Sequence, residues 1–197
     1  MAECNTDLAG EFTRACGFKP KQGVAEKWYG NWADIDREAT VLANRNTKIT
    51  TLVLKAGKKL YKAAGNDKSH KAKHALAVGD YGNGYTHTDE FVPLYIGDNE
   101  QERIQELAEG ARVFTINKMV DTGVAGETTY KIAGFESGML ITNDDFDSSA
   151  NSGTSTIICA TKEGEEEATR LKIFLLAGGV EATQTWIDTN TYVAPAP

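Results

Sequence analysis

The chain has 197 residues, of which 41% are hydrophobic and 25% charged, and a formal net charge of -7 at pH 7. A chain of this length and composition can bury a sizeable core without a cofactor or a staple. The acidic balance argues against a dedicated nucleic-acid-binding protein, which usually carries a basic surface. Cys4, Cys16 and Cys159 are odd in number and widely spaced, so neither a disulfide framework nor a zinc site is indicated.

The start of the chain indicates synthesis in the cytoplasm. Residues 1–7 lack the basic start and the long apolar core of a secretory signal. No later window is long and apolar enough for a membrane span. We therefore expect a soluble protein with no membrane partner.

The first 45 residues are predicted to form an arm that leads into a first strand near Glu26–Trp32. Glycines interrupt this segment too often for a long helix. The strand signal then sharpens in Lys48–Leu54, which is followed by a turn at Gly57 and a possible partner strand in Lys58–Lys62. Together these two segments predict a hairpin.

A second pair of strands is expected around a glycine-rich turn. His74–Val78 and Tyr85–Val92 flank the turn Gly79–Gly84. Pro93 cannot donate to a ladder of hydrogen bonds, which makes Tyr85–Val92 a candidate edge strand. Edge strands are places where subunits can join.

One helix is predicted from about Asn99 to Ala111, with Asp98 as its N-cap and Gln101 at the capping-box position. Behind it, short segments rich in β-branched and aromatic residues recur at 112–119, 129–135, 154–160 and 170–176. The pattern predicts a mainly β fold, a sandwich or barrel with one flanking α-helix and extended loops. We divide it into an N-terminal arm and first strand (1–45), a β-sandwich domain (46–193) and a short proline-rich tail (194–197).

No pattern of catalytic or cofactor-binding residues is present in the sequence. His70 and His74 lie four residues apart, but in a lysine-rich segment whose charge repels a cation. Segment 143–147 offers an asparagine and three aspartates, yet its spacing is not that of an EF-hand, and a polar turn is the better interpretation. We expect no enzymatic activity, no metal and no cofactor.

Aromatic and charged residues indicate a role in contacts. Trp28 and Trp32 could form a platform for a sugar, although such clusters more often fill a core or an interface. Seven lysines crowd between Lys55 and Lys73, whereas glutamates mark the predicted helix and the segment 163–167. Opposite patches favour head-to-tail contact between copies, although both can equally be solvated faces. The candidate subunit-interface residues are Lys55, Lys58, Lys59, Lys62, Trp28, Trp32, Pro93, Glu102 and Glu106.

Several features occur along the chain in a distinctive order. They are Cys16 with Gly17, and then the segments 27–36 (KWYGNWADID), 49–61 (ITTLVLKAGKKLY), 102–110 (ERIQELAEG) and 130–142 (YKIAGFESGMLIT). This order resembles that of virion structural proteins of tailed phages and prophages of Bacteroidetes, including crAss-like phages. The resemblance covers most of the chain from Cys16 to Leu176.

The resemblance implies a tail-tube or neck-ring subunit, whose family fold is a β-sandwich with a flanking helix and a long projecting loop. The implied partners are copies of the chain in a ring or tube, other tail or neck proteins, and genomic DNA that passes through the lumen without specific binding. The implied location is the virion, after synthesis in the host cytoplasm. An acidic lumen suits this role because it repels DNA phosphates. Two other classes stay open: a capsid decoration or head-fibre protein, and a carbohydrate-binding β-sandwich module.

Overall fold

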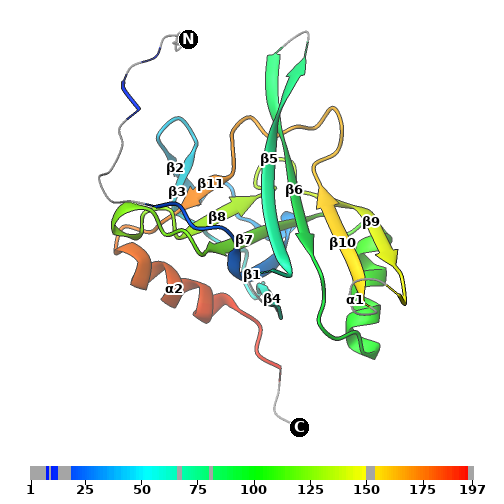
Figure 1. The fold of residues 1–197 in the computed structure, drawn as a ribbon. Helices are drawn as coiled ribbons and strands as arrows, with labels where there is room; N and C mark the ends of the chain where they lie inside the picture. The colour runs from blue at the N-terminus through cyan, green and yellow to red at the C-terminus, as the bar shows by residue number, and fades with distance from the viewer. Residues whose placement is uncertain are drawn as a thin grey trace.

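The computed structural model describes residues 8, 10–12, 19–65, 68–79, 82–149 and 154–194, which form two β-sheets with two flanking α-helices (Figure 1). The larger sheet has the strand order β2 (Val41–Ala43), β3 (Lys48–Thr51), β11 (Lys172–Phe174), β8 (Tyr130–Ala133), β7 (Val113–Met119), β1 (Val24–Asn31) and β4 (Tyr61–Ala63). The smaller sheet has the order β5 (His70–Gly79), β6 (Gly82–Phe91), β10 (Ser155–Ala160) and β9 (Leu140–Phe146). The helices are α1 (Asp98–Ala108) and α2 (Gly179–Asn190). The predicted mainly β fold with a flanking helix is confirmed.

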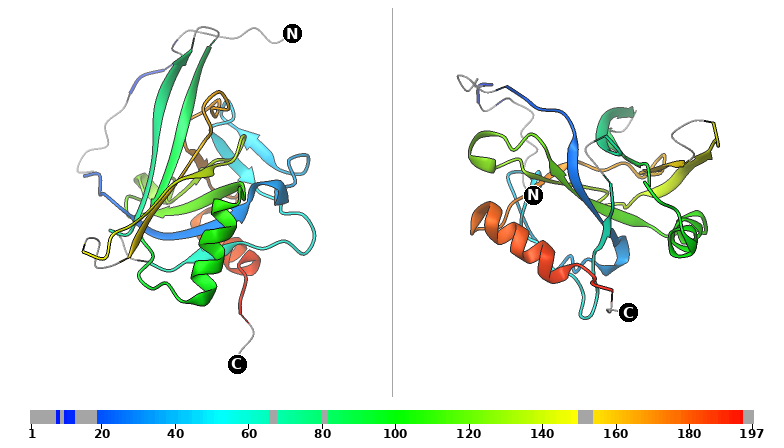
Figure 2. Two further views of the ribbon diagram at one scale, coloured as in Figure 1. Left: turned by 90° about the vertical axis from the view of Figure 1, so that its right-hand side faces the viewer. Right: turned by 60° about the horizontal axis from the view of Figure 1, so that its bottom comes forward.

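The two faces of the larger sheet pack against different elements, because successive side chains of a strand point to opposite sides. On the face toward the smaller sheet, Val113, Ala133 and Met139 form a second hydrophobic cluster with Cys159 of β10. Trp28, Phe114 and Ile116 belong to the same core cluster as Ile187 of α2. The side chain of Lys27, the next residue to Trp28, instead reaches the smaller sheet. The main hydrophobic core therefore lies between the larger sheet and α2, on the side away from the smaller sheet (Figure 2).

Helix α2 is a second helix that the sequence analysis did not predict. Its segment contains several threonines, which are weak helix formers. Burial explains why it forms: Thr183 and Ile187 are fully buried, and the ring of Trp186 packs edge-on against Phe174 with 5.4 Å between centroids. The Thr183 hydroxyl also accepts a hydrogen bond from the N–H of Leu176 at 3.0 Å, which ties the first turn to the preceding loop.

The predicted helix from Asn99 to Ala111 is confirmed as α1, which ends earlier, at Ala108. Its cap differs from the prediction by one residue. Gly97 is the N-cap, and its N–H donates to the Glu100 carboxylate at 3.1 Å. Of the α1 side chains, Ile104 is buried, so the helix packs with a narrow apolar face.

The predicted hairpin of 48–54 with 58–62 is wrong. Strand β3 pairs with β2 and, in parallel, with β11, whereas β4 pairs with β1. Strand β2 comes immediately before β3, but β11 and β1 are far from their partners in the sequence, and a local pattern carries no information about those two pairings. Consequently β1 and β2, which the sequence analysis placed in the N-terminal region 1–45, are part of the larger sheet.

The edge position predicted from Pro93 is also wrong. Strand β6 lies between β5 and β10, and it ends at Phe91, before the proline. Pro93 is buried, and its carbonyl accepts a hydrogen bond from the Thr154 hydroxyl. The backbone of Pro93 lacks an N–H, but this removes no hydrogen bond between strands, because β6 has already ended.

Strands β5 and β6 form the long hairpin that was predicted around the turn Gly79–Gly84, of which residues 80 and 81 lie outside the described residues. The hairpin extends well beyond the rest of the domain (Figures 1 and 2). Strand β10 pairs with β6 from Thr88 to Phe91, so the far half of the hairpin has left the four-stranded part of the sheet. Cys4, Cys16 and residues 195–197 of the predicted tail also lie outside the described residues.

Candidate functional site

The two tryptophans predicted as contact residues lie in different surroundings. Trp28 is only 2% exposed and lies in the main core, with the Lys62 ammonium 5.6 Å from its ring. Trp32 is half-buried, with the guanidinium groups of Arg37 and Arg112 at 4.2 and 5.5 Å from its ring. The two rings therefore form no joint platform for a sugar, and Trp28 offers no surface that a neighbour could reach.

Most of the predicted interface lysines have partners within the chain. Lys58 pairs with Asp34 at 3.2 Å, Lys62 pairs with Glu26 at 2.5 Å, and Lys59 donates to the Thr189 carbonyl at 2.8 Å. Lys55 is exposed. On α1, Glu102 and Glu106 both pair with Arg103. These groups are accessible, and their role between subunits stays a prediction.

The two edges of the smaller sheet carry opposite charges. Strand β5 forms one edge and exposes Lys71 and Lys73, of which Lys71 pairs with Glu90 of β6 at 2.5 Å, whereas β9 forms the other edge and exposes Asp144 and Asp145. The sequence analysis interpreted 143–147 as a turn, but β9 continues through Phe146, which turns these aspartates into edge-strand residues. The sequence analysis did not predict this acidic edge, because it placed the acidic patches on the helix and on the segment 163–167.

A fully buried ion pair between Lys27 and Asp89 joins the two sheets. The Lys27 ammonium also donates to the carbonyls of Lys71 at 3.1 Å and Glu90 at 3.0 Å. The Asp89 carboxylate accepts further hydrogen bonds from Tyr29 (3.1 Å), Thr115 (2.7 Å) and Asn117 (3.2 Å). Because hydrogen bonds are directional, the network fixes the orientation of β5 and β6 relative to the larger sheet.

A second polar cluster holds the middle of the hairpin. The N–H of Gly134 donates to Nδ1 of His87 at 3.1 Å, and Nε2 of His87 lies 2.9 Å from the Thr169 carbonyl. Burial, the main cause, lowers the pKa of His87 to about 4, so the ring is neutral at pH 7. The backbone of Tyr85 pairs with that of Glu167, a fully buried residue whose own pKa is raised by burial.

The sequence analysis missed Lys27, Asp89 and His87. A signal was present, because His87 and Asp89 alternate with Phe91 along one face of the predicted strand. Polar residues at inward positions of a strand indicate a buried network, but their partners are set by the packing of the two sheets: those of Asp89 lie on β1 and β7, and those of His87 are Gly134 and Thr169.

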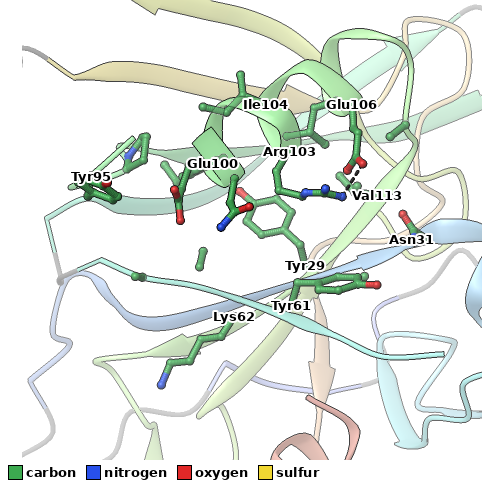
Figure 3. Close-up of a pocket in the computed structure, with 18 of the residues that line it drawn as sticks. Tyr29, Asn31, Tyr61, Lys62, Tyr95, Glu100, Arg103, Ile104, Glu106 and Val113 are labelled. Atoms are coloured by element: carbon green, nitrogen blue, oxygen red, sulfur yellow. Dashed lines mark hydrogen bonds and ion pairs between the residues drawn. The ribbon is translucent and has the colours of Figure 1, made fainter. Parts of the chain in front are cut away.

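A groove of about 810 Å³ lies between α1 and the end of the larger sheet at β1 and β4 (Figure 3). Tyr29, Tyr61 and Tyr95 give it an aromatic lining, and charged residues of α1 form its rim. Among the described residues that line it there is no serine, cysteine or histidine, so a nucleophile paired with a base is missing.

Within the described ranges, no group of three or more His, Cys, Asp or Glu side chains could hold a metal ion. None of the helices in those ranges is long and apolar enough to cross a membrane. Burial raises the pKa of the Cys159 thiol to about 12, which makes it unreactive at neutral pH. No family model, no curated protein and no solved structure matches the chain.

Proposed function

We propose that this chain is a non-enzymatic structural subunit of a phage virion, which joins copies of itself head to tail into a ring or tube of the tail or neck. The observation that carries the proposal is the opposite charge on the two edges of the smaller sheet. Lys71 and Lys73 mark the β5 edge, and Asp144 and Asp145 mark the β9 edge.

The two charged edges lie at the same height in the sheet. Lys71 is opposite Glu90 on β6, Glu90 is opposite Ile158 on β10, and Ile158 is opposite Asn143 on β9. A second copy can therefore place its acidic edge beside the basic edge of the first after a rotation about an axis along the strands. Such a contact joins two different surfaces, and repeating it gives a closed ring or an open helix.

The buried network supports this use of the sheet. Lys27 donates to the Lys71 carbonyl from within the chain and so ties the basic edge strand to the larger sheet. Charge pairs at the rim of an interface set its orientation and its rate of formation more than its affinity. The rigid junction between the sheets would hold every copy at one angle, which a ring of defined size requires.

A conduit for DNA fits the acidic balance of the chain. The formal net charge is -7, and a wall of that sign repels phosphates and lets DNA slide. A capsid decoration or head-fibre protein is the alternative assembly, and microscopy distinguishes them because a decoration protein forms no ring with an open lumen. Partners other than copies of the chain would be neighbouring tail or neck proteins.

A charge swap tests the proposal. In Lys71→Glu/Lys73→Glu both edges are acidic, and in Asp144→Lys/Asp145→Lys both are basic. We expect the native chain to form rings in negative-stain microscopy and either double variant to form none. Combining all four changes restores opposite edges and should restore the rings. Glu38→Lys/Glu181→Lys changes the same number of charges at two exposed glutamates that lie on neither edge of the smaller sheet and are not candidate interface residues. This matched control should leave the rings intact.

The thermal unfolding of each variant checks that the fold survives, since exposed ion pairs contribute only about 0–1 kcal/mol. Three results would count against the proposal: a native chain that stays monomeric in light scattering at all concentrations and salts, edge variants that assemble normally, or rings lost in the Glu38→Lys/Glu181→Lys control instead.

A further inference from the structure

The groove between α1 and β4 is bordered by a strand edge that is open in the described part of the chain. Strand β4 is the last strand of the larger sheet. The backbone of Leu60 bonds to Asn190 and Tyr192, on the side away from β1. Since backbone groups alternate between the two sides of a strand, the N–H and the carbonyl of Lys62 point to that same side. No described residue pairs with them there, and an open edge is a site where another extended segment can add.

The lining of the groove beside this edge is apolar. Tyr61 and Ala63 lie on the same face of β4, and Tyr61 is opposite Tyr29 of β1. The α1 side of the groove contributes Leu107, and Tyr95, at one end, is 74% exposed. Figure 3 shows the two β-strand tyrosines on one side of the groove and the α1 side chains on the other. A strand added to β4 would turn every second side chain toward this lining.

Two carboxylates that line the groove have no cationic partner among the described residues. The Glu100 carboxylate accepts a hydrogen bond from the N–H of Gly97 at 3.1 Å. The Glu109 carboxylate accepts one from the side-chain amide of Gln105 at 3.2 Å. Both hydrogen-bond donors are neutral, so each carboxylate keeps its full negative charge at the groove.

The other charged residues that line the groove are already paired within the chain. Arg103 pairs with Glu106, as the dashed line in Figure 3 shows, and Lys62 pairs with Glu26 at 2.5 Å. The groove therefore presents an apolar lining with two uncompensated negative charges. Charge complementarity favours an occupant that carries two basic side chains.

The spacing of the two carboxylates sets the spacing of those basic side chains. Glu100 and Glu109 are nine residues apart, at the beginning and the end of α1. At about 1.5 Å per residue, the helix places them roughly 13 Å apart. An extended strand, at about 3.3 Å per residue, covers that distance in about four residues. Side chains four residues apart in a strand point to the same face, and the side chain midway between them points there too.

The chain itself offers no free segment with this pattern. Only two pairs of lysine or arginine residues in the sequence are four apart, namely Lys55 with Lys59 and Lys58 with Lys62. The first pair has Gly57, a turn residue, at its middle position. The second pair ends in β4 and so belongs to the edge itself. The pattern therefore points to a different protein and not to a second copy.

We propose that an extended segment of another protein, with basic side chains at positions i and i+4 and an apolar one at i+2, docks in this groove as an added strand on β4. The apolar side chain packs on the aromatic lining, the basic side chains pair with Glu100 and Glu109, and the backbone bonds to Lys62. The site goes beyond the proposed function, because the ring contact uses the edges of the smaller sheet.

Two synthetic peptides test the proposal by fluorescence anisotropy with the full chain. The peptide TKVLVKT carries its lysines four apart, on one face of a strand. The peptide TKVLKVT has the same composition and charge but places its lysines on opposite faces. We expect the first to bind at least about tenfold more tightly, a difference of about 1.4 kcal/mol. Added salt should reduce this difference, because the charge pairs lie at the rim.

A pair of matched variants locates the binding site. Glu100→Gln/Glu109→Gln removes both charges and keeps the helix cap, because glutamine also serves at the capping-box position. This variant should bind the two peptides equally. Glu38→Gln/Glu181→Gln removes two exposed charges outside the groove and should keep the native preference.

Methylation of peptide amides tests whether the segment adds as a strand. One form of TKVLVKT is methylated at the amide nitrogens of both valines, and the other at those of the leucine and both lysines. Because alternate N–H groups of an added strand face β4, one form should lose binding and the other should retain it. The form that fails also gives the direction of the added strand.

The proposal is overturned if the two parent peptides bind alike or if neither binds at about 1 mM. It is also overturned if the Glu100→Gln/Glu109→Gln variant keeps the preference, or if the two methylated forms bind alike. A second copy in the groove would be revealed by light scattering in dilute solution, as a fall in particle mass when the peptide binds, and this too contradicts the proposal. The charge swap at β5 and β9 is independent of all these outcomes.

Discussion

The buried ion pair offers a direct test of how the two sheets are held together. Lys27 and Asp89 are both fully buried. Changing Asp89 to alanine leaves the Lys27 ammonium with two backbone carbonyls and no counter-charge, and it also leaves the groups of Thr115 and Asn117 without their acceptor. We expect the free energy of unfolding to fall by about 3–5 kcal/mol, the usual cost of breaking a buried pair from one side.

The double variant Lys27→Met/Asp89→Leu removes both charges and should cost less than Asp89→Ala alone, because no unpaired charge remains. Urea unfolding at pH 7, followed by tryptophan fluorescence, measures the free energy of unfolding of each variant. With the single variants Lys27→Met and Asp89→Leu, these values complete a double-mutant cycle. Lys162→Met, which breaks an exposed pair with Glu165 at 3.0 Å, is the surface control and should cost less than about 1 kcal/mol. The reasoning is refuted if Asp89→Ala costs as little as this control, or if the double variant costs the sum of the single ones.

Two further predictions follow from buried groups. The pKa of His87 is lowered to about 4 in the fold, against an ordinary 6.5, so the unfolded chain binds a proton that the folded chain does not. Stability should therefore fall by about 3 kcal/mol as pH drops from 6.5 to 4, and His87→Gln should reduce that fall in urea titrations at pH 7 and 4.5; an unchanged fall would contradict it. A methyl group at Gly30 would lie 2.6 Å from Cζ of Phe114, so Gly30→Ala should cost about 1–3 kcal/mol in the same assay. Gly10→Ala, with nothing within 4 Å of the added atom, should cost nothing measurable, and equal losses at the two positions would reject the packing argument.

The sequence was enough to predict those helices and strands that are indicated by the pattern of residues within their own segments. The hairpin of β5 and β6 follows from alternating residues on both sides of a glycine-rich turn, and α1 follows from its apolar spacing, although its predicted cap was one residue off. Strands β7 and β10 follow from β-branched and aromatic residues in short runs. These features depend on contacts between residues that are near one another in the sequence.

Which strands and helices pack together was decided by the tertiary structure. The residue pattern of one segment does not show which distant segment it pairs with. The parallel pairing of Lys48 with Ile173 joins segments more than a hundred residues apart, and no pattern in either one selects the other. Helix α2 forms from a poor helical sequence because Thr183 and Ile187 are buried against the larger sheet. Lys27 forms a buried ion pair between the sheets, whereas Asp144 and Asp145 of β9 lie exposed at a sheet edge. Both outcomes have the same reason, because burial and exposure are properties of the packed sheets. The sequence alone determined only the positions of these charges along the chain.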